Sequence, residues 1–182
     1  MFSSWRRLRR AARRFKRASE GSAAVEFGLV AVPFFMLIFG MAEVAMLGLG
    51  QTSLNYAVAE AGREIRTGEA QRDGVMETEF VQMVCDNLNS FILMSCQDTL
   101  FVDVDRFDSF VDLDEQDDPM ANGDLDDSNF GFDPGVASDI VVVRAYYRWH
   151  LLTPMFEQLL GNVSGGERIL ISTMMFRNEP FQ

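Results

Sequence analysis

Glu26 lies at the start of an apolar stretch, five residues after a glycine. A charged carboxylate is unexpected at such a position. Residues 18–44 read ASEGSAAVEFGLVAVPFFMLIFGMAEV. A carboxylate that enters a bilayer is costly unless a positive group neutralises it. Cleavage between Gly21 and Ser22 would supply that group, because Ser22 would then carry a free α-amine and Glu26 would be the fifth mature residue. In a helical filament, the amine of one subunit could neutralise the Glu26 carboxylate of its neighbour. The alternative is that Glu26 lies at the lipid headgroups before a plain anchor.

The sequence contains two cysteines, Cys85 and Cys96, which could form a disulfide. Two thiols in an oxidising compartment usually pair. In an unbroken helix they would lie about 16 Å apart, whereas a disulfide requires Cα atoms within about 7 Å. A bridge therefore requires a turn between them, which the weak helix formers Asn87, Asn89 and Ser90 would permit. The closed loop would stabilise the fold by about 3 kcal/mol. The alternative is two buried free thiols, and two cysteines alone are too few for a structural zinc site.

Acidic residues are concentrated in residues 108–139, which read DSFVDLDEQDDPMANGDLDDSNFGFDPGVASD. Three oxygen-bearing residues alternate there as calcium ligands can: Asp124, Asp126 and Ser128. An EF-hand-like loop would then require glycine at position 129 and glutamate at position 135, where the sequence has Asn129 and Gly135. We therefore interpret the stretch as a solvated, flexible loop, with calcium binding as the alternative.

Catalysis is not indicated by any motif in the sequence. The single histidine, His150, ends an aromatic segment, where histidines more often pack or face solvent. A Ser-His-Asp device would have to use His150, yet no G-x-S-x-G motif is present. No phosphate-binding loop or paired zinc-ligand motif is present either. The sequence predicts a protein that is not an enzyme and has no cofactor or metal.

The charge distribution predicts the orientation of the chain in a membrane. Residues 1–21 contain seven Arg, one Lys and one Glu, a net charge of +7, whereas the rest of the chain has a net charge of −18. Lys and Arg beside an apolar run remain on the cytoplasmic side. We expect a bacterial inner-membrane protein with its N-terminus in the cytoplasm and everything after residue 50 in the periplasm. The basic segment is short and lies against the membrane, so we do not expect it to bind nucleic acid.

The apolar run itself extends from Phe27 to Gly50 and contains one charge, Glu43. A helix of this length spans about 36 Å, against about 30 Å for the hydrocarbon core. The run can therefore cross the bilayer once, with Glu43 near the far face; Pro33 is tolerated in a membrane helix. A secretory signal has its small-residue cleavage site after the apolar region, whereas Gly21-Ser22 precedes it. This order is that of a prepilin leader.

The remaining sequence predicts an α+β fold. Beyond the membrane, the helix is predicted to continue to Thr67-Gly68, which is expected to end it. Four residues at helical spacing form one apolar stripe on this part: Leu54, Val58, Ala61 and Ile65. A second helix is predicted from Val75 to about Asn87, with one apolar face: Met76, Phe80, Val84 and Leu88. Three strands are predicted at 99–107, 139–149 and 167–178, and a short helix within 152–161.

We expect the three strands to form a small antiparallel sheet packed on the amphipathic part of the long helix. The predicted divisions are a basic cytoplasmic leader (1–21), a transmembrane and amphipathic helix (22–68) and a head (69–182) that includes the acidic loop 108–139.

The N-terminal region resembles the TadE-like family, minor pilins of the tight-adherence (Flp-type IV) pilus system. Residues 21–68 read GSAAVEFGLVAVPFFMLIFGMAEVAMLGLGQTSLNYAVAEAGREIRTG. The matching features are the Gly-small-Ala-Ala-Val-Glu-Phe entry, the early proline, the glutamate near the exit, and an alanine-rich segment with Arg63 and a closing Gly68. Two C-terminal segments, YYRWHLLTPMFEQLLG and FRNEPF, resemble the end of longer family members.

The resemblance implies a minor pilin or pilin-like subunit that primes, caps or joins a pilus. It implies four partners: the major Flp-type pilin, a second TadE-like subunit, the prepilin peptidase and the assembly platform. The alternative is an uncleaved, membrane-anchored periplasmic adaptor of a secretion or assembly apparatus. A sensor domain on a signal anchor is a third interpretation, for which the sequence offers no ligand site.

Overall fold

The chain folds into the predicted combination of a long N-terminal helix, shorter helices and an antiparallel sheet. The computed structural model describes residues 19–88, 94–96, 98–109, 118–120 and 122–181. The elements in chain order are α2 (Ser19–Thr67), α3 (Glu69–Asp73), α4 (Glu77–Leu88), β1 (Leu100–Phe107), β2 (Ile140–Trp149), η2 (Pro154–Phe156), α5 (Glu157–Leu160) and β3 (Arg168–Arg177). Two compact units, Met1–Ala42 and Glu43–Gln182, divide within α2.

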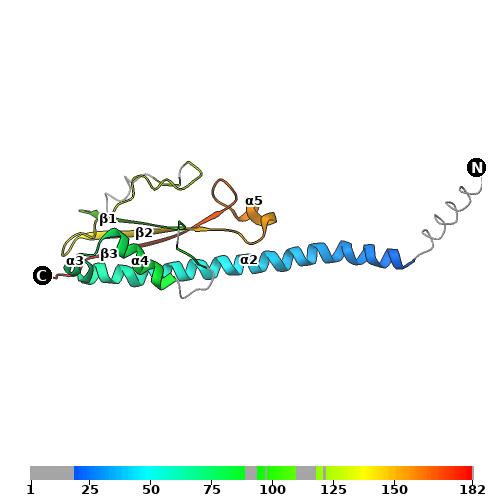
Figure 1. The fold of residues 1–182 in the computed structure, drawn as a ribbon, viewed down its shortest axis with the longest axis horizontal. Coiled ribbons are helices and arrows are strands. Elements are labelled where there is room, and N and C mark those ends of the chain that lie inside the picture. The colour runs from blue at the N-terminus through cyan, green and yellow to red at the C-terminus, as the bar shows by residue number, and fades with distance from the viewer. Residues whose placement is uncertain (1–18, 89–93, 97, 110–117, 121, 182) are drawn as a thin grey trace, which may run out of the picture. The chain divides into compact units, whose positions relative to one another are not determined.

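The sheet has three antiparallel strands in the order β1-β2-β3 (Figure 1). The register places Val143 of β2 opposite Val104 of β1 and Met174 of β3. Side chains of a strand alternate between its two faces, so these three residues share one face. The centre of β2 is buried on both faces, which explains why its sequence is a nearly continuous apolar run.

The core of the second unit lies between this face of the sheet and the C-terminal part of α2, which runs beside it in Figure 1. The predicted apolar stripe of α2 is at most 1% exposed: Leu54, Val58, Ala61 and Ile65. Burying one large aliphatic side chain stabilises a fold by about 1.5–3 kcal/mol. Helix and sheet approach closely at Gly50, where an added Cβ would lie 2.7 Å from the Trp149 ring.

α4 covers the same core and begins two residues later than predicted. Phe80, Val84 and Leu88 are fully buried, as their spacing indicates. The prediction that Met76 belongs to this face is wrong, because Met76 precedes the helix and is 63% exposed. Its backbone N–H instead donates to the Glu79 carboxylate at 3.0 Å, which satisfies one donor at the helix start.

The described part of the acidic stretch contains no helix or strand, but it is more than a solvated loop. The backbone of Val104 in β1 exchanges hydrogen bonds with Gly131 (2.9 Å) and Asp133 (2.8 Å), so the end of the stretch pairs with the edge of the sheet. The Phe132 ring lies 5.4 Å from that of Phe80 in α4. Long-range pairing of this kind leaves no periodic signal in a loop sequence.

Candidate processing and assembly site

Gly21, Ser22 and Glu26 lie in the first turns of α2, and all three are exposed. The Ser22 hydroxyl donates to the Glu26 carboxylate at 3.0 Å, so the carboxylate is oriented toward the residue that cleavage would make N-terminal. No atom lies within 4 Å of a Cβ added to Gly21. Because the Gly21-Ser22 peptide bond is helical, a peptidase that cut it would first have to unwind this end. Glycine makes that easier, since it weakens a helix by about 0.5–1 kcal/mol relative to Ala.

The part of α2 that follows carries apolar side chains on every side. Twelve large apolar residues of the first unit are exposed to at least 36%: Val25, Phe27, Leu29, Val30, Val32, Phe34, Phe35, Met36, Leu37, Ile38, Phe39 and Met41. A helix that is apolar all round belongs inside a membrane or among other helices. α2 is also long and apolar enough to cross a membrane. It therefore fits a membrane anchor, with Glu26 at its entrance.

Glu43, the second carboxylate of the apolar run, is 2% exposed and belongs to the second unit. Its two oxygens accept the backbone N–H groups of Leu152, at 3.0 Å, and Thr153, at 3.1 Å. Sequence reasoning placed Glu43 near the far end of the anchor and missed these partners, which lie more than a hundred residues away in the chain. A lone charge in an apolar run indicates that some partner must exist, but it cannot identify which.

Cys85 and Cys96 are joined in a disulfide, with their Cα atoms 5.8 Å apart. Cys85 lies in α4 and Cys96 just before β1, so the bond links a helix to the sheet. Asn87 remains inside α4, whereas the proposed break at Asn89 and Ser90 lies outside the described residues. Close to the bridge, the Tyr147 hydroxyl donates to the Ser95 carbonyl at 2.9 Å and accepts its N–H at 3.1 Å.

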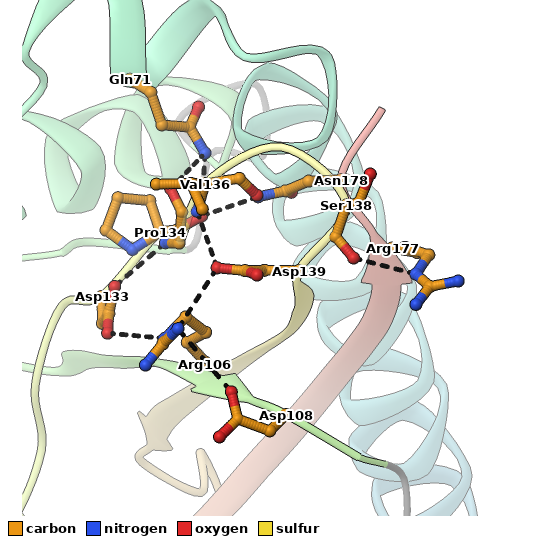
Figure 2. A network of polar contacts seen from close by, with 11 residues as sticks. Gln71, Arg106, Asp108, Asp133, Pro134, Val136, Ser138, Asp139, Arg177 and Asn178 are labelled. Carbon is orange, nitrogen blue, oxygen red and sulfur yellow. Dashed lines mark hydrogen bonds and ion pairs between the residues drawn. The ribbon is translucent and has the colours of Figure 1, made fainter. Parts of the chain in front are cut away.

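A polar network ties the end of the acidic stretch to α3 and to the segment that follows β3 (Figure 2). The Arg106 guanidinium lies 3.6 Å from Asp133 and 3.6 Å from Asp139. The Pro134 carbonyl accepts hydrogen bonds from Gln71 of α3, at 2.8 Å, and from Asn178, at 2.9 Å. These residues converge on one another in Figure 2 and join four segments of the second unit.

A second polar cluster lies on the sheet face opposite the core. Asp103 is buried and pairs with the Arg144 guanidinium at 3.1 Å, while its other oxygen accepts the Gly131 N–H at 3.1 Å. Burial raises the pKa of the Asp103 carboxyl above its ordinary value, and Asp105 adds to the rise; the Gly131 N–H and Arg144 oppose it. Burial also raises the pKa of the Tyr146 hydroxyl on this face.

The residues considered for catalysis and for calcium binding, His150 and Asp126, are exposed. The exposed His150 ring pairs with Glu167 at 2.7 Å. In the calcium hypothesis, Asp126 is a ligand; it accepts the Ser128 N–H at 3.1 Å, and bonds from Ser128 lower the pKa of its carboxyl. Within the described ranges, no group of three His, Cys, Asp or Glu residues is arranged to hold a metal ion.

The described residues combine an apolar N-terminal helix, with a glycine and a glutamate near its start, and an α+β unit. Residues 21–63 match the model of a family described as TadE-like protein. The matched residues include Gly21, Ser22, Glu26 and Glu43. No curated protein and no solved structure matches the chain.

Proposed function

We propose that the chain is a minor pilin that is inserted in the inner membrane, cleaved after Gly21, and used to prime, cap or join a tight-adherence pilus. The observation that carries the proposal is the TadE-like match, which begins at Gly21 and includes Glu26 in register. The exposed apolar helix that follows supports it, because such a helix can exchange lipid for neighbouring helices in a filament. The partners would be the major Flp-type pilin, a second TadE-like subunit, the prepilin peptidase and the assembly platform.

Cleavage has a clear physical purpose in this scheme. The leader carries a net charge of +7, and charged groups do not cross the hydrocarbon region readily. An intact leader would therefore hold the subunit at the cytoplasmic face. Removing it frees the Ser22 amine beside the Glu26 carboxylate and lets the helix leave the bilayer.

Orientation is tested with a reporter fused after Gln182. The basic leader should remain in the cytoplasm, so a reporter that works only in the periplasm should be active there. Activity of a strictly cytoplasmic reporter at the same position would contradict the whole scheme.

Processing is tested by mass spectrometry of the mature N-terminus. Wild-type protein should begin at Ser22, and Gly21→Leu should keep its leader and fail to enter pili. Gly28→Leu is the matched control, because Gly28 lies in the same helix with no atom within 4 Å of an added Cβ, and it should be cleaved normally. A wild-type chain that begins at Met1 or Phe2 would favour the uncleaved adaptor instead.

A further inference from the structure

The connection between β2 and β3 presents an apolar surface to solvent. Within residues 151–160, here called the apolar turn, Leu152 is 63% exposed, Met155 55% and Leu159 77%. Met155 and Leu159 are four residues apart in the consecutive helices η2 and α5, so they project to one side. Leu151 and Leu160 pack against the core instead. The inner side of the turn therefore packs against the core, and its outer side faces solvent.

The outer side of the apolar turn carries no charge. Its single charged residue is Glu157. An added Cβ on Gly166 would lie 2.7 Å from the Glu157 Cβ and 3.0 Å from its Oε2. Glu157 is therefore packed against the loop before β3, on the protein side of the turn. Three flexible aliphatic side chains without an outward charge suit a lipid surface better than a polar protein partner.

Glu43 joins the apolar turn to the part of α2 that directly follows the first unit. Its carboxylate holds the N–H groups of Leu152 and Thr153, and it directly follows the apolar residues of the first unit. The 21 residues from Ser22 to Ala42 form a helical span of about 32 Å, which matches the hydrocarbon core of about 30 Å. A span that begins at Ser22 therefore ends next to Glu43, whose carboxylate accepts the N–H groups of the turn.

We propose that the apolar turn is a second membrane contact, in which Leu152, Met155 and Leu159 insert into the headgroup boundary where α2 leaves the bilayer. This inference rests on the membrane anchoring that the proposed function requires, and not on cleavage or pilus assembly. The contact holds the globular unit at the membrane surface until the subunit is withdrawn. Glu43 is a positioning residue for it.

The test uses the full-length protein, with its disulfide intact, in phosphatidylcholine and phosphatidylglycerol vesicles that contain spin-labelled lipids. A fluorophore is attached in turn to Leu159→Cys in the apolar turn, Phe35→Cys in the anchor, and Val136→Cys. Val136 is the matched control because it is 64% exposed and precedes β2, whereas the turn follows β2. Lipids labelled near the headgroup should quench Leu159, and lipids labelled deep in the chains should quench Phe35. Val136 should keep its fluorescence with both.

The outcomes separate the two proposals. Quenched Phe35 with Leu159 no more quenched than Val136 overturns the turn contact and leaves the anchor intact. Unquenched Phe35 overturns the anchoring and the turn contact together. Leu159 that is unquenched in vesicles but shielded in purified pili would make the turn a protein interface, which also overturns the lipid assignment.

A charge placed on the turn provides a second measurement that does not depend on the core. Met155→Asp, introduced beside the labelled Leu159→Cys, should abolish most of the quenching at Leu159, because a carboxylate resists entry into the boundary. The fold should be unaffected because Met155 is exposed. Met76→Asp is the control for added charge, since Met76 is also exposed and lies just before α4. Unchanged quenching in Met155→Asp overturns the proposal.

Discussion

Gly68 satisfies two constraints at the junction of α2 and α3. Its φ is +78°, and an added Cβ would clash with the Phe181 ring. A side chain in this left-handed region costs about 1–2 kcal/mol, and displacing a packed ring costs about 1–3 kcal/mol more. We predict that Gly68→Ala lowers the free energy of unfolding by about 2–5 kcal/mol, measured by denaturant titration.

The matched control for this prediction is Gly74→Ala. Gly74 also has a positive φ, +67°, but no atom lies within 4 Å of its added Cβ. Gly74→Ala should therefore lose only the backbone contribution. Equal losses in both variants would show that Phe181 does not constrain position 68.

Asp103 gives the fold a pH dependence whose sign follows from its burial. Because its folded-state pKa is raised above the ordinary 3.8, the folded protein binds the proton more tightly than the unfolded chain does. The stabilisation by this group is complete below 3.8 and is lost as the pH rises through the folded-state pKa. The unfolding free energy of the wild type, minus that of Asp103→Asn, should therefore increase as the pH falls from neutrality toward 3.8.

The same pH series measured for Asp127→Asn is the control, since Asp127 is exposed. Its difference from the wild type should change less with pH than that of Asp103→Asn. A difference for Asp103→Asn that does not vary with pH would show that Arg144 and the Gly131 N–H offset the cost of burial completely.

At the scale of elements, periodicity predicted most of the fold. The three strands begin and end within one or two residues of their predicted bounds, because alternation along a half-buried strand is a strong local signal. The five-residue helix α3, enclosed by Gly68 and Gly74, is too short to show a period. The pairing of Phe132 with β1 and the partners of Glu43 also escaped prediction, because contacts between distant segments depend on the completed fold.

The Cys85–Cys96 bond links α4 to the segment that precedes β1. We predict that the double variant Cys85→Ser and Cys96→Ser loses about 3 kcal/mol of unfolding free energy, because the unfolded chain regains the freedom of the closed loop. Reductant should destabilise the wild type by a similar amount and leave the double variant unchanged. Alkylation of both thiols in protein taken from cells, without reductant, would contradict the bridge.

At the scale of the whole molecule, cleavage after Gly21 and pairing of Glu26 with a neighbouring amine stay predictions. Gly21, Ser22 and Glu26 are neighbours in the chain, so their relation can be read directly from their spacing. The neutralising partner proposed for Glu26 belongs to another subunit, and no single chain contains that contact. The assembly role must therefore be tested in cells that make pili.

Glu26→Ala is the variant that tests pairing between subunits. If the Ser22 amine of a neighbour neutralises this carboxylate, Glu26→Ala should be cleaved after Gly21 yet enter pili poorly, because the buried amine would lose its counter-charge. Glu26→Gln should fail in the same way, since it keeps a hydrogen-bond acceptor but not the charge. Mass spectrometry of the N-terminus and immunoblots of sheared pili provide the two measurements.

Ser22→Ala separates charge pairing from the hydrogen bond between the Ser22 hydroxyl and the Glu26 carboxylate within one chain. The new N-terminal alanine retains its α-amine, so Ser22→Ala should be cleaved and should assemble normally. Loss of pili in Ser22→Ala, with normal pili in Glu26→Gln, would assign the role to the hydroxyl. Normal pili in both Glu26 variants, each with a free residue 22 amine, would mean that no neighbouring amine depends on this carboxylate and that it marks only the membrane entrance.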